Sequence, residues 1–209
     1  VKYYSNEFGI FLENQDLIHI LVETDTSLTT LDDTLYKVVM HLTDDTTRTV
    51  FPMNKNSWYT NYIFPHTGPT KGLCNVPNYQ TAVYPNVYKQ IDLNVTGNMY
   101  GVKEQFVVKP GGDFADIKFT YRGADTVYID NGELVIATII DTIVYQPPFC
   151  SQIDSSGSYV TIGWSPIFTM IGDTVTFDSV GIFNSNLPLV FEMNQGTGVY
   201  SIAGGGGDN

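Results

Sequence analysis

The chain has 209 residues, of which 43% are hydrophobic, 13% aromatic and 15% charged. This hydrophobic fraction is enough for a packed core and argues against disorder. The charged fraction lies well below the roughly 25% usual in soluble domains, which suits extracellular β proteins. The net charge of −12, from 22 acidic and 10 scattered basic residues, argues against nucleic acid as a partner. No apolar run approaches the about 20 residues of a membrane span.

The first third of the chain predicts strands separated by an irregular aromatic segment. Residues 8–23 form two apolar runs around a polar connection, which is a hairpin pattern. Residues 35–43 predict a further strand with alternating apolar positions. Between residues 54 and 76 the periodicity fades, and we interpret this segment as a long, packed excursion or a crossover between two halves.

The central stretch, residues 74–125, has the clearest alternation. Residues 87–95 and 117–122 alternate apolar and polar side chains, as half-buried strands do. In residues 100–108, Glu104 shares one face with apolar neighbours. Proline and glycines at residues 110–112 end that strand, since proline has no N–H and glycine adopts positive φ.

The rest of the chain continues as β structure. Residues 126–137 predict a hairpin, because Asn131-Gly132 supplies the two positive-φ residues of a type I′ turn. Shorter strands are expected near residues 139–145, 159–164, 174–177 and 187–191, and little helix anywhere. We therefore predict an all-β, mostly antiparallel β-sandwich, with two packed β modules as an alternative. The expected boundaries are an N-terminal module over residues 1–75, a C-terminal module over residues 76–203 and a flexible glycine-rich tail over residues 204–209.

The two cysteines, Cys74 and Cys150, leave two readings open. In an oxidising compartment a disulfide between them would stabilise the fold by about 4 kcal/mol. The alternative is two separate buried thiols.

No catalytic or metal-binding pattern stands out. The histidines are isolated in sequence, the acidic pairs fit solvated turns, and no cofactor motif is present, so we expect a non-enzymatic protein without cofactor or metal. A glycosidase carboxylate pair needs no sequence spacing and is neither favoured nor ruled out. Tyrosine and tryptophan give rigid contact area with a polar edge, which indicates a binding surface for protein or carbohydrate. The candidate aromatic residues are Trp58, Tyr59, Tyr62 and Phe64.

Several strings resemble one bacterial domain family. They include Ile91-Asp92-Leu93, Phe106-Val107-Val108, Pro110-Gly111 and Gly123-Ala124-Asp125. Together they resemble the N-terminal β-rich domain of unknown function that precedes SBBP-type β-propeller repeats in secreted surface proteins. The resemblance covers roughly residues 1–192, and such proteins are common in the Bacteroidota and often carry a type IX secretion sorting tail. The family supplies no catalytic residues to carry over.

The resemblance also implies O-glycosylation at triplets in which Asp is followed by Ser or Thr and then by a small or aliphatic residue or threonine. The acceptors in such triplets are Thr34, Thr46, Thr126, Thr142, Thr174 and Ser179.

We therefore expect a non-catalytic extracellular or cell-surface module that acts through protein assembly or surface attachment. Its expected partners are other surface proteins or copies of itself. The alternatives are a carbohydrate-binding or carbohydrate-active secreted domain, and a fibre or filament subunit.

Overall fold

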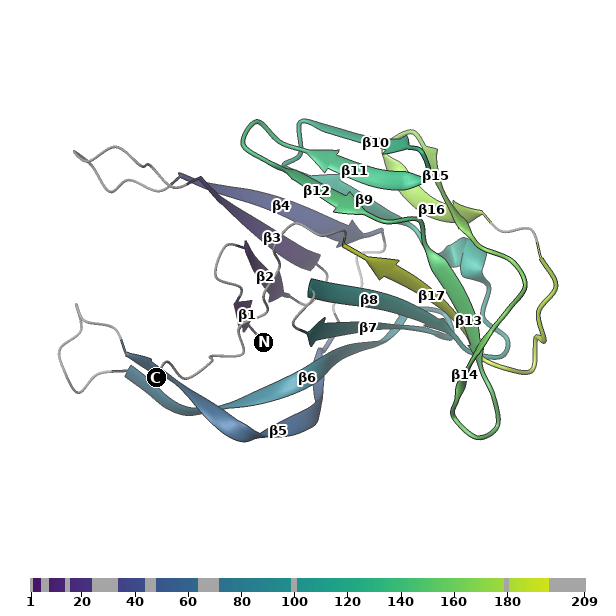
Figure 1. Cartoon of the computed structure of the whole chain (residues 1–209), viewed down its shortest axis with the longest axis horizontal. Helices are drawn as coiled ribbons and strands as arrows, with labels where there is room; N and C mark the ends of the chain where they lie inside the picture. The colour runs from purple at the N-terminus through teal and green to yellow at the C-terminus, as the bar shows by residue number, and fades with distance from the viewer. Residues whose placement is uncertain are drawn as a thin grey trace.

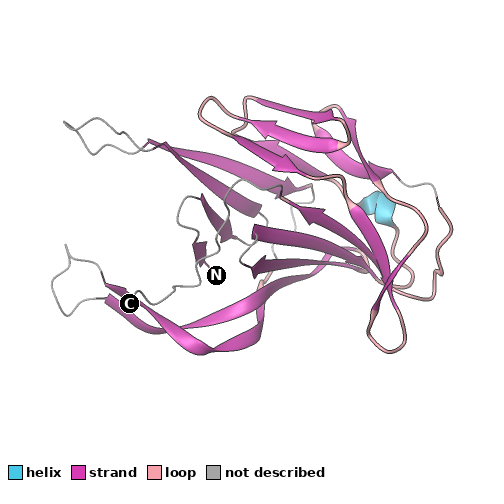
Figure 2. Cartoon of the chain, in the orientation of Figure 1, coloured by secondary structure: helices cyan, strands magenta, loops and turns pink. Residues whose placement is uncertain are grey.

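Antiparallel strands make up most of the computed structural model, together with one 3-10 turn at Phe114–Asp116 (Figures 1 and 2). The all-β, antiparallel prediction is confirmed. The structure describes residues 2–4, 8–13, 16–23, 34–43, 48–63, 72–98, 101–178 and 181–195.

The first sheet has seven strands in the order β1-β2-β3-β4-β9-β16-β15. Its β2–β3 hairpin confirms the prediction for residues 8–23, and β4 buries Val38, Met40 and Leu42 completely. The bounds are β1 Lys2–Tyr4, β2 Phe8–Leu12, β3 Asp16–Glu23, β4 Thr34–Leu42, β9 Phe119–Arg122, β15 Ile167–Ile171 and β16 Thr174–Asp178.

The second sheet also has seven strands, in the order β14-β13-β17-β8-β7-β6-β5, and it curls around the molecule (Figure 1). The strands predicted within residues 87–95 and 100–108 correspond to β7 and β8 at its middle, although a turn at residues 89–90 separates β7 from β6. The strand predicted at residues 117–122 is β9, which belongs to the first sheet. The bounds are β5 Phe51–Ile63, β6 Gly72–Tyr88, β7 Ile91–Asn98, β8 Gly101–Val108, β13 Phe149–Ile153, β14 Tyr159–Thr161 and β17 Leu189–Asn194.

The third sheet contains β10 (Thr126–Asp130), β11 (Glu133–Ala137) and β12 (Thr142–Tyr145). Its first hairpin has the predicted register, with Val127 opposite Ile136. Asn131 and Gly132 have φ values of 49° and 86°, as a type I′ turn requires. The sequence thus defined this hairpin down to its residue pairs.

One hydrophobic core joins the three sheets. A row of paired residues across the second sheet, which includes Phe106 and Phe191, faces the first sheet. Phe106 stacks on Phe119 at 5.9 Å between ring centroids, and Phe191 lies 5.0 Å from Phe177. Each fully buried side chain of this size contributes about 1.5–3 kcal/mol of hydrophobic free energy.

The shared core revises the expected division into two modules. The boundary between residues 75 and 76 falls inside β6. Strands from both sides of that boundary share the first and the second sheet, and their apolar faces form a single core. The described residues therefore fold as one unit without a division at residue 75, while the tail at 204–209 lies outside the described residues.

Candidate functional site

A two-stranded arm replaces the packed excursion expected between residues 54 and 76, and that prediction was wrong. The arm consists of residues 54–63 of β5 and residues 72–80 of β6, which pair with each other beyond the point where β6 leaves β7. Figure 1 shows this ribbon projecting from the sheets. Its hydrophobic pattern lacks a clear period because neither face is packed on a core.

Solvent reaches most of the arm. Trp58 is 42% exposed and Tyr59 50% exposed, Tyr62 is half-buried, and Phe64 lies outside the described residues. Lys55 lies over the Tyr59 ring at 5.1 Å from its centroid. Adjacent large aromatic side chains that are exposed to solvent are typical of interaction surfaces.

Polar side chains, in place of a core, hold the two strands of the arm together. Asn78 Nδ2 donates to Thr60 Oγ1 at 3.0 Å, and the backbone N–H of Asn75 donates to Asn61 Oδ1 at 2.8 Å. Asn54 and Asn75 adopt positive φ, and the register shifts between Lys55 and Tyr59. Irregularities of this kind, with Pro52 and Lys55 on the edge strand, oppose unselective edge-to-edge pairing.

Charge is strongly segregated along the chain. Residues 46–91, which include the whole arm, contain four of the ten basic residues and none of the 22 acidic ones. We call the rest of the molecule the body; it carries all the acidic side chains. The arm therefore presents a weakly basic, aromatic surface beside a strongly acidic one. The segregation is visible in the sequence, because the 46 residues between Asp45 and Asp92 contain no carboxylate. The sequence analysis considered only the total charge and did not predict it.

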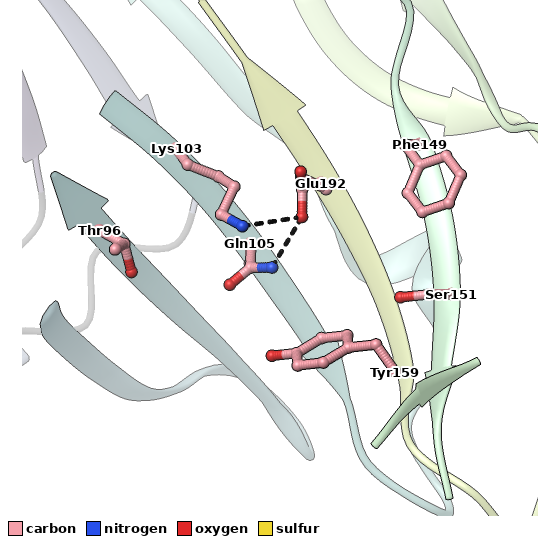
Figure 3. A pocket seen from close by; sticks show the side chains of 7 residues that line it. All are labelled: Thr96, Lys103, Gln105, Phe149, Ser151, Tyr159 and Glu192. Carbon is pink, nitrogen blue, oxygen red and sulfur yellow. Dashed lines mark hydrogen bonds and ion pairs between the residues drawn. The ribbon is translucent and has the colours of Figure 1, made fainter. Parts of the chain in front are cut away.

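A groove lies on the face of the second sheet that points away from the core. It has a volume of about 240 Å³ and is lined by five strands of the sheet (Figure 3). Strand alternation places its residues there, since each except Tyr159 on the exposed strand β14 neighbours a core residue along its strand, as Gln105 neighbours Phe106. The lining residues are Thr96, Lys103, Gln105, Phe149, Ser151, Tyr159 and Glu192.

A buried polar cluster occupies the point where the three sheets meet. Tyr145 of β12 donates to Glu104 Oε1 of β8 at 3.1 Å, and Gln195 Nε2 donates to the Tyr145 hydroxyl at 2.9 Å. Gln195 Nε2 also lies 3.4 Å from Nδ1 of His19 on β3. The hydroxyl of Tyr121 lies beside that of Tyr145 without a well-aligned hydrogen bond among the described residues.

Burial sets the protonation of this cluster. Loss of solvent raises the pKa of Glu104 to about 8, which the hydrogen bond from Tyr145 partly offsets, and lowers the pKa of His19 to about 4. At neutral pH both side chains are therefore mainly uncharged. Since Glu104 is 0% exposed, the cluster joins the sheets and offers no surface to a substrate.

The two cysteines are free thiols in the structure, which favours the second of the two alternatives, except that one of the thiols is exposed. Cys74 is exposed on the arm, whereas Cys150 is fully buried on β13. Three strands separate β13 from β6, which at about 4.8 Å per strand puts them roughly 19 Å apart. A disulfide requires Cα atoms within about 7 Å.

The predicted glycosylation acceptors lie on several surfaces. Thr34, Thr126 and Thr142 are exposed and Thr174 is half-buried. Thr46 and Ser179 lie outside the described residues. Their modification stays a prediction.

The two histidines within the described residues do not form a site, and His66 lies outside those residues. His19 and His41 lie in strands β3 and β4, as expected, and His41 Nδ1 pairs with Asp16 Oδ1 at 2.7 Å. Among the described residues, no three His, Cys, Asp or Glu side chains gather as metal ligands. The same part of the chain contains no helix long and apolar enough to cross a membrane.

The fold and these surfaces define an all-β protein with a projecting arm and an open groove on one sheet. A comparison with family models matches residues 1–192 to a domain of unknown function, DUF7948, and the chain belongs to that family. Comparisons with curated proteins and with solved structures found no match.

Proposed function

We propose that this chain is a non-catalytic structural module of a secreted or cell-surface protein and acts by protein assembly. In this proposal the arm of one copy binds the acidic body of the next. The observation that carries the proposal is the arm, on which the large side chains of Trp58 and Tyr59 lie in solvent and not in the hydrophobic core.

Stability supports a partner for the arm. A two-stranded ribbon is marginally stable in water by itself, and the described side chains of the arm are exposed or half-buried apart from Thr60. A protein surface packed on Trp58 and Tyr59 would bury apolar area and order the ribbon, at about 25 cal/mol for each Å² removed from water.

Charge supports a second copy as that partner. Like copies with a net charge of −12 repel each other through their bodies. The arm carries one basic residue, Lys55, and no carboxylate, so an arm-to-body contact lacks the charge repulsion of a body-to-body contact. Such a contact joins two different surfaces, and repeated head-to-tail it generates rings or filaments.

The extracellular location rests on composition and on the resemblance to domains that precede SBBP-type repeats. The low charged fraction and the exposed acceptors Thr34, Thr126 and Thr142 are compatible with a glycosylated surface protein. Type IX secretion is part of the same proposal.

Sedimentation velocity over a concentration series tests the assembly. The double variant Trp58→Ser with Tyr59→Ser should weaken self-association by at least about tenfold, or about 1.4 kcal/mol. Tyr128→Ser, which removes a tyrosine that is 47% exposed on β10, is the matched control and should associate like the wild type. Wild-type chain that stays monomeric up to millimolar concentration contradicts the proposal.

A further inference from the structure

We infer that the groove on the second sheet binds a neutral saccharide. This inference goes beyond assembly by the arm, because the groove lies on β7, β8, β17, β13 and β14 and includes no arm residue.

The two aromatic residues stand at opposite ends of the groove. Phe149 is 44% exposed on β13, and Tyr159 is 56% exposed on β14. Tyr159 pairs with Ile153, four residues along β13 from Phe149, so the two lie roughly 13 Å apart along the strand direction. Ser151 lies between them. In Figure 3 the Tyr159 ring extends from β14 toward Gln105 on β8.

The floor of the groove is polar and already ordered. Glu192 Oε2 accepts from Gln105 Nε2 at 2.8 Å and pairs with Lys103 Nζ at 3.3 Å (Figure 3). Glu192 Oε1 accepts from Asn194 Nδ2 at 3.1 Å. Gln105 and Ser151 are buried at the base, so their side chains lose little freedom when a ligand binds.

This combination matches the chemistry of a sugar ring. The hydroxyl groups of a sugar both donate and accept, and the floor offers a carboxylate, an amide, an ammonium and a hydroxyl side by side. The C–H face of a pyranose is weakly positive and packs on the electron-rich face of an aromatic ring. A volume of about 240 Å³, below the roughly 300–1,000 Å³ of drug-sized pockets, suits one or two such rings.

Other ligand classes fit the groove less well. Lys103, the one basic residue in its lining, is paired with Glu192, so a phosphate or a sugar acid finds no unpaired cation there. A peptide strand needs an open sheet edge, whereas the groove lies on the face of the sheet. Glu192 is also the one carboxylate in the lining, and glycoside hydrolysis ordinarily uses two. The geometry therefore favours binding over cleavage.

Isothermal titration calorimetry of the full chain with four neutral hexasaccharides, those of cellulose, laminarin, mannan and xylan, tests the inference. We expect at least one to bind with a Kd of about 1 mM or tighter. Tyr159→Ala and Phe149→Ala should each weaken that binding about tenfold, while Tyr128→Ala, on a different sheet, leaves it unchanged. Circular dichroism checks that each variant is folded. We expect both groove variants to fold, because the side chains of Phe149 and Tyr159 are exposed and do not belong to the core.

Three results would overturn the inference. The first is no heat of binding with any of the four saccharides at 10 mM ligand. The second is binding that persists at wild-type strength in both groove variants. The third is binding of an anionic hexasaccharide from alginate in preference to all neutral ones. Each leaves the arm proposal standing, because that proposal is measured by self-association without saccharide.

Discussion

The substitution Glu104→Gln tests whether a buried, protonated carboxyl holds the three sheets together. Burial raises the pKa of Glu104 to about 8 from its ordinary value of 4.5. The folded chain therefore holds this proton more tightly than the unfolded chain does. The stability that this group contributes is fully present below pH 4.5 and is lost as the pH rises through 8.

The magnitude follows from the width of that window. Between pH 4.5 and pH 8, each pH unit removes about 1.36 kcal/mol of stability through Glu104. The amide introduced by Glu104→Gln is not ionisable, so this variant lacks the loss. The free energy of unfolding of the wild type, relative to the variant, should fall by about 2.7 kcal/mol between pH 5.5 and pH 7.5. His19, whose pKa burial lowers to about 4, acts in the opposite direction below pH 6.5 and cancels in the comparison because both proteins contain it.

Urea unfolding at half-unit pH steps, followed by tryptophan fluorescence, measures the difference. Glu13→Gln, which replaces an exposed carboxyl on the β2–β3 turn, is the control and should keep the wild-type pH dependence. Parallel stability curves for the wild type and Glu104→Gln would refute the reasoning, since Glu104 would then ionise alike in the folded and unfolded chains.

Other predictions address the thiols, two glycines and the surface threonines. In the native chain a thiol reagent should modify Cys74 alone, because burial raises the pKa of the Cys150 thiol to about 12; two reactive thiols before unfolding would contradict this. Gly123→Ala should cost about 2 kcal/mol or more, since φ is +84° and the new Cβ would meet the Lys37 carbonyl oxygen of β4. Gly157→Ala, with φ of +83° and open space around it, should lower the free energy of unfolding by only about 1 kcal/mol. Equal urea midpoints for the two glycine variants would contradict the clash expected between the alanine Cβ at position 123 and the Lys37 carbonyl oxygen. Peptides that contain Thr34, Thr126 or Thr142, prepared from the native source, should include forms heavier than their sequence mass by a glycan, and recovery of all three only at their sequence mass would end the glycosylation prediction at these exposed positions.

Strands packed on the core were predictable from alternation. The hairpin around Asn131-Gly132 and the buried face of β8 followed from a period of two, because one face of each strand lies against the core. The same alternation placed Glu104 among apolar neighbours. It did not show that Tyr145, 41 residues further along, would supply its hydrogen bond.

The arm and the groove were harder to predict for different physical reasons. The arm buries neither face, so its residues carry no hydrophobic period that separates it from a loop. The groove gathers residues as far apart as Thr96 and Glu192, and only the pairing of β17 with β8 brings them together. The separation of Cys74 from Cys150 likewise depends on strand order within the second sheet.

Cross-linking from Cys74 gives the most direct test of assembly by the arm. A photoreactive maleimide attached to this exposed thiol leaves the buried Cys150 unmodified, so the probe sits on the arm alone. Irradiation of the associated chain, followed by mass spectrometry of a mixture of isotopically light and heavy copies, identifies contacts between copies. We predict cross-links from the arm of one copy to the body of another, at positions outside residues 46–91. Their yield should fall as the salt concentration rises, because salt screens the attraction between arm and body. Cross-links confined to a single copy, or arm-to-arm links alone, would contradict the proposed assembly.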